Sequence, residues 1–182
     1  FHGNNKTVSE LEMAVDCGIG SVIIDAFEEV DRLEAVCAAK GKRQRVLFRV
    51  KPGVHADTHE FISTGQNDSK FGFGIEDGEA MRLAKYILEH KHLDFVGIHC
   101  HIGSQVFSVD GFAKAARIMF DFFCKMEKEL NIHMEEMIIG GGFGVNSMPT
   151  DEPGTFGEKI DAMGEVMRDE AAKMGREIPE IV

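Results

Sequence analysis

The chain has no apolar segment approaching the about 20 consecutive residues needed to cross a bilayer, so we expect no membrane partner. Its opening residues, Phe1 to Lys6, are polar and contain glycine, which is not typical of a secretion signal. Basic residues are scarce, because 20 Lys and Arg oppose 31 Asp and Glu, for a formal net charge of −11. Nucleic-acid-binding proteins carry basic patches, so this charge argues against a nucleic-acid partner.

Cysteine is also sparse. The four cysteines form no Cys-x-x-Cys pair and are widely spaced, at Cys17, Cys37, Cys100 and Cys124. This spacing argues against a zinc site and is typical of reduced thiols, so we expect a cytoplasmic protein without a structural metal. The hydrophobic content of 43% and charged content of 28% are ordinary for a soluble globular protein, and 182 residues suffice for one domain with a core.

Strand and helix patterns alternate along the chain. We expect strands at 1–5, 21–26, 45–50, 93–101, 137–139 and 178–182. We expect helices at 7–18, 28–40, 77–90, 111–131 and 156–174, with long loops at 55–70 and 146–154. This order, with continuous apolar strands, predicts a parallel sheet of either the doubly wound or the (β/α)8 barrel type. A whole barrel needs roughly 250 residues, so the chain would form most of one.

Two charged residues stand at predicted strand ends, where parallel sheets gather their functional groups. Asp25 shares a face with Ile23 and would point inward, although it would also suit the N-cap of the next helix, with Glu28 completing the box. Arg49 shares a face with Leu47 in an apolar run, and a buried arginine is costly unless it is paired. We therefore expect Arg49 to pair with Asp25, either as a structural ion pair or while also contacting a cofactor hydroxyl.

The strand at 93–101 ends in two histidines. Alternation places Phe95, Gly97, His99 and His101 on the inward face, with His101 nearer the top and His99 deeper, as a hydrogen-bonded core residue. The His-x-His spacing also suits a metal ion, so a metal-dependent barrel hydrolase using His99 and His101 is the alternative.

Two glycine-containing turns follow predicted strands. Gly103-Ser104 offers backbone N–H groups and a hydroxyl, which can cradle an anion. Gly140-Gly141-Gly142 lets the backbone approach a ligand where a Cβ would clash. Together they predict a two-part phosphate grip with the His101 ring stacked on the ligand beside it.

With these motifs the chain resembles the fold-type III pyridoxal-phosphate-dependent decarboxylases, which have an alanine-racemase-like barrel. The resemblance covers essentially the whole chain and is carried by residues 2–6, 62–66, 68–74, 99–105 and 140–144. The Ser-Thr-Gly-Gln and Ser-Lys-Phe-Gly motifs favour the diaminopimelate branch over the ornithine and arginine branches. The resemblance implies a partial (β/α)8 TIM barrel, pyridoxal 5'-phosphate as cofactor, decarboxylation of an amino-acid substrate to lysine and CO2, and a homodimer with shared active sites.

The resemblance also assigns roles to residues. It implies that His101 stacks on the pyridine ring, that Ser104 and the backbone of Gly140 to Gly142 bind the phosphate, and that Asp25 and Arg49 lie near the cofactor. The family's Tyr-Ala-x-Lys-Ala motif, with the lysine that is joined to the cofactor, does not occur in the sequence, nor does its Glu-Pro-Gly-Arg motif. We therefore expect residues 1–182 to be a single incomplete cofactor-binding barrel domain, a fragment without the C-terminal β-domain and inactive alone.

Overall fold

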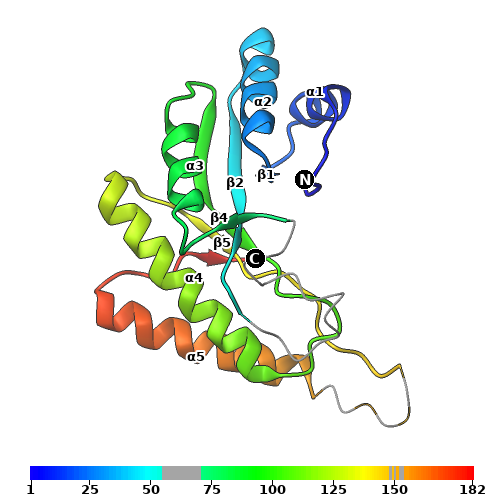
Figure 1. The fold of residues 1–182 in the computed structure, drawn as a ribbon, viewed down its shortest axis with the longest axis vertical. Helices are drawn as coiled ribbons and strands as arrows, with labels where there is room; N and C mark the ends of the chain where they lie inside the picture. Colours follow the sequence, from blue (N-terminus) through cyan, green and yellow to red (C-terminus); the bar gives the residue numbers. More distant parts are fainter. Residues whose placement is uncertain (55–70, 148, 150, 152–153) are drawn as a thin grey trace.

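The computed structural model describes residues 1–54, 71–147, 149, 151 and 154–182. The expected loop at 55–70, with its Ser-Thr-Gly-Gln motif, thus lies outside the described residues. Helices and strands alternate along the described chain (Figure 1). The helices are α1 (Val8–Cys17), α2 (Phe27–Lys40), α3 (Glu79–Leu88), α4 (Val109–Leu130) and α5 (Phe156–Met174). The strands are β1 (Ser21–Ile24), β2 (Gln44–Lys51), β3 (Phe73–Gly74), β4 (Leu93–Cys100), β5 (Glu136–Ile138) and β6 (Glu180–Ile181).

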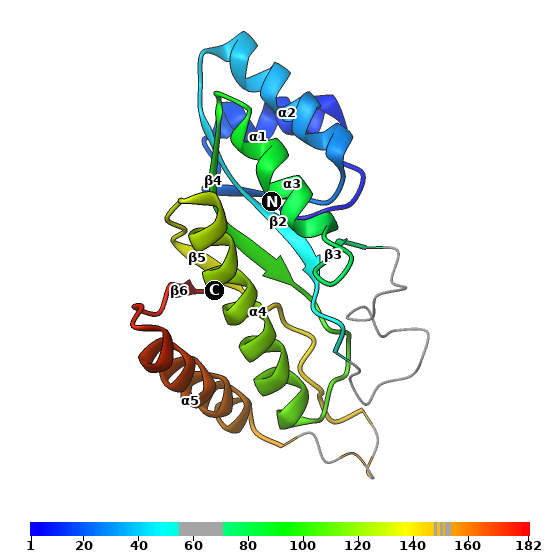
Figure 2. The same ribbon diagram turned by 60° about the vertical axis from the view of Figure 1, so that its left-hand side comes forward.

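The strands form one parallel sheet in the order β1-β2-β4-β5-β6, and the short β3, which the sequence did not predict, pairs with β2. Within the described part of the chain the sheet is not closed, and β1 and β6 are its edges. All pairings are parallel, and each main crossover carries a helix, with α4 and α5 side by side in both views (Figures 1 and 2). The prediction of a parallel, partial barrel is confirmed in this form.

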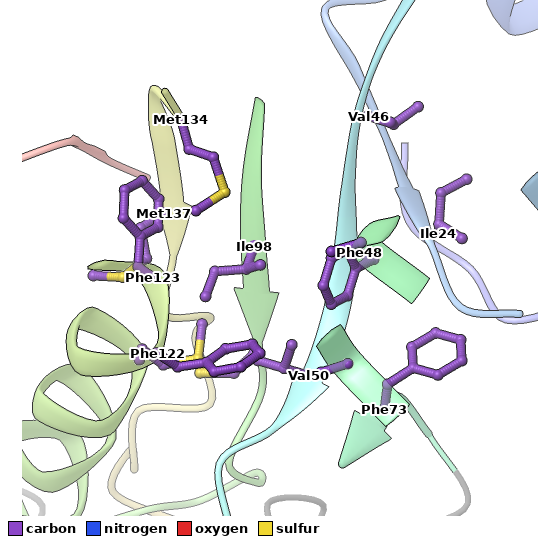
Figure 3. Packing of buried hydrophobic residues seen from close by; sticks show 14 of the residues in the cluster. Ile24, Val46, Phe48, Val50, Phe73, Ile98, Phe122, Phe123, Met134 and Met137 are labelled. Carbon is purple, nitrogen blue, oxygen red and sulfur yellow. The ribbon is translucent and has the colours of Figure 1, made fainter. Parts of the chain in front are cut away.

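The outer face of the sheet is an apolar core against the helices. Val22 and Ile24 of β1 and Phe48 of β2 are fully buried there. They belong to one cluster with Leu33 of α2 and Phe123 of α4. Figure 3 shows this interior, in which Ile98 of β4 and Met137 of β5 lie beside Phe122 and Phe123 of α4. Burial of each such large side chain stabilises the fold by about 1.5–3 kcal/mol, so this face holds the sheet and helices together.

The inner face carries a separate and smaller apolar layer. Ile23, Leu47 and Val96 are buried there, with Ile138 packed against them. The expectation of strict alternation along β4 was wrong, because Val96 lies on this inner face. The reason is that the β2–β4 register shifts between Val46 and Leu47. The shift turns Phe95 to the outer core, where its ring stacks on Phe48.

Helix ends follow local chemistry. Thr7 opens α1 with a complete capping box, and Gly18 and Gly41 close α1 and α2 in the left-handed region. The N-cap of α2 is Ala26, without a side-chain cap, so the alternative that Asp25 caps this helix was wrong. Helix α4 begins before Gly111, because Ser108 accepts a hydrogen bond from the Gly111 N–H.

Candidate functional site

The carboxyl ends of the strands surround two adjoining hollows. The strand-end hollow, of about 480 Å³, is lined by His2, Arg49, His99, His101, Ile138, Gly140, Gly141 and Val182. The side hollow, of about 250 Å³, is lined by His2, Gly3, Asn4, Ile23, Asp25, Arg49, Phe71 and His99. His2, Arg49 and His99 belong to both, so they form the wall between them. The sequence-predicted inward positions of Asp25, Arg49, His99 and His101 therefore meet at one end of the sheet.

Arg49 and Asp25 face the side hollow without forming a direct ion pair with each other. The Asp25 carboxylate accepts a hydrogen bond of 2.8 Å from the Gly72 N–H, and the Arg49 guanidinium lies 5.0 Å from the Phe71 ring centroid. Burial raises the pKa of Asp25, against the opposing effects of the Gly72 hydrogen bond and the Arg49 charge. The expectation of a direct pair is thus corrected, since Asp25 instead anchors the backbone at Gly72.

Three imidazoles gather at this end. The His2 and His99 rings meet edge to face, 4.9 Å between centroids, and His101 lies on the rim of the strand-end hollow. Burial lowers the pKa of all three, and that of His99 falls to about 3. His99 is therefore neutral at physiological pH. Its Nδ1 atom is buried without a hydrogen-bond partner, which corrects the expectation of a satisfied core histidine.

The two glycine turns lie against each other. The Val106 N–H donates to the Gly142 carbonyl (2.9 Å), and the Gly144 N–H donates to the Val106 carbonyl (3.0 Å). Gly140 and Gly142 have φ values of 80° and 85°, in the left-handed region. A Cβ on Gly142 would lie 1.8 Å from the Gly103 carbonyl oxygen, so only glycine permits this approach.

The middle glycine and the serine take different positions. Gly141 is exposed toward the strand-end hollow, and a Cβ there would meet no atom within 4 Å. Ser104 is exposed on the loop that runs beside the glycine turn and does not line the strand-end hollow itself. The structure therefore brings the two halves of the predicted phosphate grip together, with Ser104 at its outer margin.

The residues present fit a cofactor with an anionic phosphate and a flat ring. The lining of the strand-end hollow contains the Arg49 cation and no acidic side chain, although the chain is strongly acidic. The open side of Gly141 and the unpartnered His99 Nδ1 are features that a bound group would complete. A larger hollow of about 910 Å³ between α4 and α5 suits an anion less, because Arg176 there is already bound by Glu127 and further carboxylates line it.

The metal alternative requires several ligating side chains in one place. Among the residues that the structure describes, no three His, Cys, Asp or Glu side chains gather so that they could hold a metal ion. The strand-end hollow adds His2, two glycines and Arg49 to His99 and His101, and no carboxylate side chain lines it. In the same part of the chain, no helix is both long and apolar enough to span a membrane.

Sequence reasoning missed His2 as a site residue. The segment around it runs beside β1, because the Phe1 carbonyl accepts a hydrogen bond of 3.0 Å from the Ile23 N–H. This places the His2 ring against both hollows. The available signal was an imidazole at the end of a strand-like segment, directly before the glycine and asparagines of the His-Gly-Asn-Asn-Lys motif.

Comparison with known proteins gives a match over the whole chain. The family model described as "Pyridoxal-dependent decarboxylase, pyridoxal binding domain" matches residues 1–182. Diaminopimelate decarboxylase of Bacillus subtilis is 40% identical over 181 residues, which are 100% of this chain and 41% of the relative. The enzyme of the same name from Mycobacterium tuberculosis is 40% identical over 186 residues, which cover 100% of this chain and 42% of the relative. The chain thus spans about two fifths of these relatives' length.

Solved structures agree with this match. A crystal structure of diaminopimelate decarboxylase from M. jannaschii superposes with a TM-score of 0.88 at 32% identity, covering 100% of this chain and 41% of that one. The structure of that enzyme in complex with L-lysine gives a TM-score of 0.87 at 33% identity, covering 98% of this chain and 41% of that one.

Proposed function

The chain belongs to the pyridoxal-dependent decarboxylases, whose pyridoxal-binding domain it matches, and on that premise we propose that it binds pyridoxal 5'-phosphate in the strand-end hollow. We further propose that it serves within a diaminopimelate decarboxylase, which converts meso-diaminopimelate to L-lysine and CO2. The observation that carries the proposal is the meeting of His101, Arg49 and the glycine turn in one hollow, on a chain 40% identical to enzymes of that name.

The proposed work of these residues is binding and orientation. Bound pyridoxal phosphate supplies an electron sink for the carbon that loses CO2. The N–H groups of the Gly140 to Gly142 turn, with Ser104 at its margin, hold the phosphate. His101, whose pKa is lowered chiefly by burial, presents an uncharged ring to the pyridine face. Arg49 offers a positive charge at the wall between the hollows, and Asp25 keeps the Phe71-Gly72 backbone in place.

We propose that residues 1–182 act as one cofactor-binding barrel domain of a longer protein. The support is that the similar enzymes are much longer than the region they share with this chain, which is about 41% of their length. A homodimer with shared active sites is part of the proposal. The exposed side chains of Phe156 (62%) and Ile160 (42%), near the glycine turn, are apolar surface that a partner could cover. Because the four cysteines are free, we propose the cytoplasm as its compartment.

The test is a decarboxylation assay on the whole protein that carries this chain. Release of CO2 is measured from diaminopimelate, ornithine and arginine, with and without added pyridoxal 5'-phosphate. We expect cofactor-dependent release with diaminopimelate preferred. Preference for ornithine or arginine would contradict the substrate assignment, and release that is independent of the cofactor would contradict the proposed chemistry.

A further inference from the structure

A buried ion pair stands behind the wall of the two hollows. Lys6 and Glu29 have side chains that are 1% and 3% exposed, and the Lys6 Nζ lies 2.5 Å from the Glu29 Oε1. The same ammonium also donates to the carbonyls of Gly3 and Ile23, each at 2.6 Å. A lysine ammonium has three donors, and all three are used here. Lys6 therefore ties α2 to two separate stretches of backbone.

The partner carboxylate extends the connection to Asp25. The second oxygen of Glu29, Oε2, accepts a hydrogen bond of 3.1 Å from the Asp25 N–H. Asp25 leads on through its side chain to the Gly72 N–H. Glu29 thus fixes the backbone of Asp25, which directly follows β1 and lines the side hollow.

The same pair confines His2 from one side. The Gly3 carbonyl is held by Lys6, and on the other side the Phe1 carbonyl is held by the Ile23 N–H. His2 lies between these two anchors, with its ring against His99. Its place in the wall therefore depends on the Lys6 contact.

Stability alone is a weak explanation for this pair. Removing two charges from water has a cost that their attraction often fails to recover, so well-packed apolar residues would serve a core as well or better. Apolar residues, however, form no hydrogen bonds. They would leave the carbonyls of Gly3 and Ile23 and the amide of Asp25 without the partners that now fix their positions. The hydrogen bonds of the pair therefore suit a role in fixing the backbone around the two hollows.

We propose that Lys6 and Glu29 are positioning residues, which hold His2 and Asp25 in the walls of the strand-end and side hollows. The inference rests on the proposed function, since those walls would face the cofactor and the substrate. The hydrogen bonds of the pair go to Gly3, Ile23 and Asp25, and none goes to the glycine turn of residues 140–142. Loss of the pair should therefore leave phosphate binding unchanged. It should displace His2 and Asp25, and so lower the rate of the reaction.

The test uses the whole protein in four forms: wild type, Lys6→Met, Lys6→Arg and Lys40→Met. Lys6→Met keeps a flexible apolar stem and removes the donors, whereas Lys6→Arg keeps a cation. Lys40→Met is the matched control, because Lys40 lies on α2, the helix that carries Glu29, and forms an exposed 2.7 Å ion pair with Asp16 of α1. Neither residue lines either hollow. At a temperature well below each unfolding midpoint, we would measure pyridoxal phosphate affinity, visible circular dichroism of the bound cofactor, kcat/KM, and amide hydrogen exchange over residues 21–26.

For Lys6→Met we expect unchanged cofactor affinity, altered circular dichroism, faster exchange over residues 21–26, and a fall in kcat/KM of about 100-fold, as for a displacement of roughly 1 Å. Lys6→Arg should restore part of the loss, and Lys40→Met should match wild type. A Lys6→Met protein that unfolds more easily but keeps wild-type kcat/KM, dichroism and exchange would overturn the proposal.

The test still decides the positioning role if Lys6→Met does not fold or if the proposed function itself fails. If Lys6→Met does not fold, Glu29→Gln replaces it, because the glutamine can still accept from the Asp25 amide; wild-type values in every readout would then refute the proposal. If wild type binds pyridoxal phosphate without decarboxylating diaminopimelate, the proposed function fails. The exchange and dichroism of Lys6→Met would still decide the positioning role, with unchanged values counting against it.

Discussion

The two ends of the sheet's inner face use the same residue types differently. At the amino end, Arg45 of β2 donates to Glu135 (2.8 Å) and to Glu136, so its charge is satisfied within the protein. Four residues further along the same strand and face, Arg49 lines two hollows, and its neighbour across the register, His99, has an unpartnered Nδ1. The apolar layer around Leu47 separates the two ends. Charges that satisfy one another serve the fold, whereas those left facing a hollow are available to a ligand.

The largest test of this contrast concerns the glycine turn. Gly142→Ala would place a Cβ 1.8 Å from the Gly103 carbonyl oxygen at a φ of 85°, so the strands' carboxyl end must rearrange. We expect a loss of more than about 4 kcal/mol in the free energy of unfolding, or loss of cofactor binding. The matched control is Gly141→Ala, whose Cβ meets nothing within 4 Å and should change stability by less than about 0.5 kcal/mol. Denaturant unfolding of both variants would measure these two changes in the free energy of unfolding. Equal losses of stability in the two variants would contradict the geometry of the glycine turn.

The two arginines of β2 give the second test. Arg49→Met should lower kcat/KM by about 10- to 100-fold, because a lost hydrogen bond to a charged group is worth about 1.5–3 kcal/mol. Arg45→Met breaks a partly exposed pair, so it should cost at most about 1 kcal/mol of stability and leave kcat/KM unchanged. Steady-state kinetics and unfolding curves on both variants decide it. The functional contrast between the ends is wrong if Arg45→Met lowers kcat/KM as much as Arg49→Met.

Variants of Ser104 and His101 should distinguish binding of the cofactor phosphate from orientation of the cofactor ring. Ser104→Ala should weaken cofactor binding by about 1.5–3 kcal/mol, the range for a hydrogen bond to a charged group. His101→Ala should lower turnover more than cofactor affinity, since stacking orients the ring while the glycine turn holds the phosphate. His133→Ala, which removes an imidazole whose side chain is 79% exposed, is the control. Cofactor titration and kcat report the two effects, and wild-type turnover in His101→Ala would remove the stacking role.

The smallest expected effect is a pH dependence of stability. The pKa of His99 is lowered to about 3, below the about 6.5 of an unfolded chain, so the unfolded state binds the proton more readily. The contribution of neutral His99 to stability is therefore complete above pH of about 6.5 and is lost as the pH falls toward 3. Between pH of about 7.5 and about 5.5, wild type should lose roughly 1.4 kcal/mol more than His99→Gln. Parallel curves for the two proteins would show that His99 is not buried as a neutral ring.

Local pattern predicted the inner face wherever alternation was regular. Ile23 with Asp25, and Leu47 with Arg49, lie on the expected face because β1 and β2 pair in unbroken register there. On β4 the register shift at Val96 reversed the expected places of two apolar residues, and composition cannot show such a shift when both neighbours are apolar.

The contacts that escaped prediction are long-range. Asp25 binds the Gly72 amide, 47 positions away, and the Lys6 ammonium reaches Glu29 across 23 positions. Neither pairing leaves a periodic signal in the sequence, because each depends on how separate segments meet after folding. The position of His2 has the same origin, since it follows from the contacts that hold the first residues beside β1.

The most direct test is a crystal structure of the whole protein with pyridoxal 5'-phosphate bound. The account predicts the phosphate within hydrogen-bond distance of the Gly140 to Gly142 turn, and the pyridine ring against His101. It also predicts that the ion pairs of Arg45 are unchanged at the opposite end. A cofactor seated elsewhere, such as beside Arg176 between α4 and α5, with the strand-end hollow filled only by solvent, would contradict it.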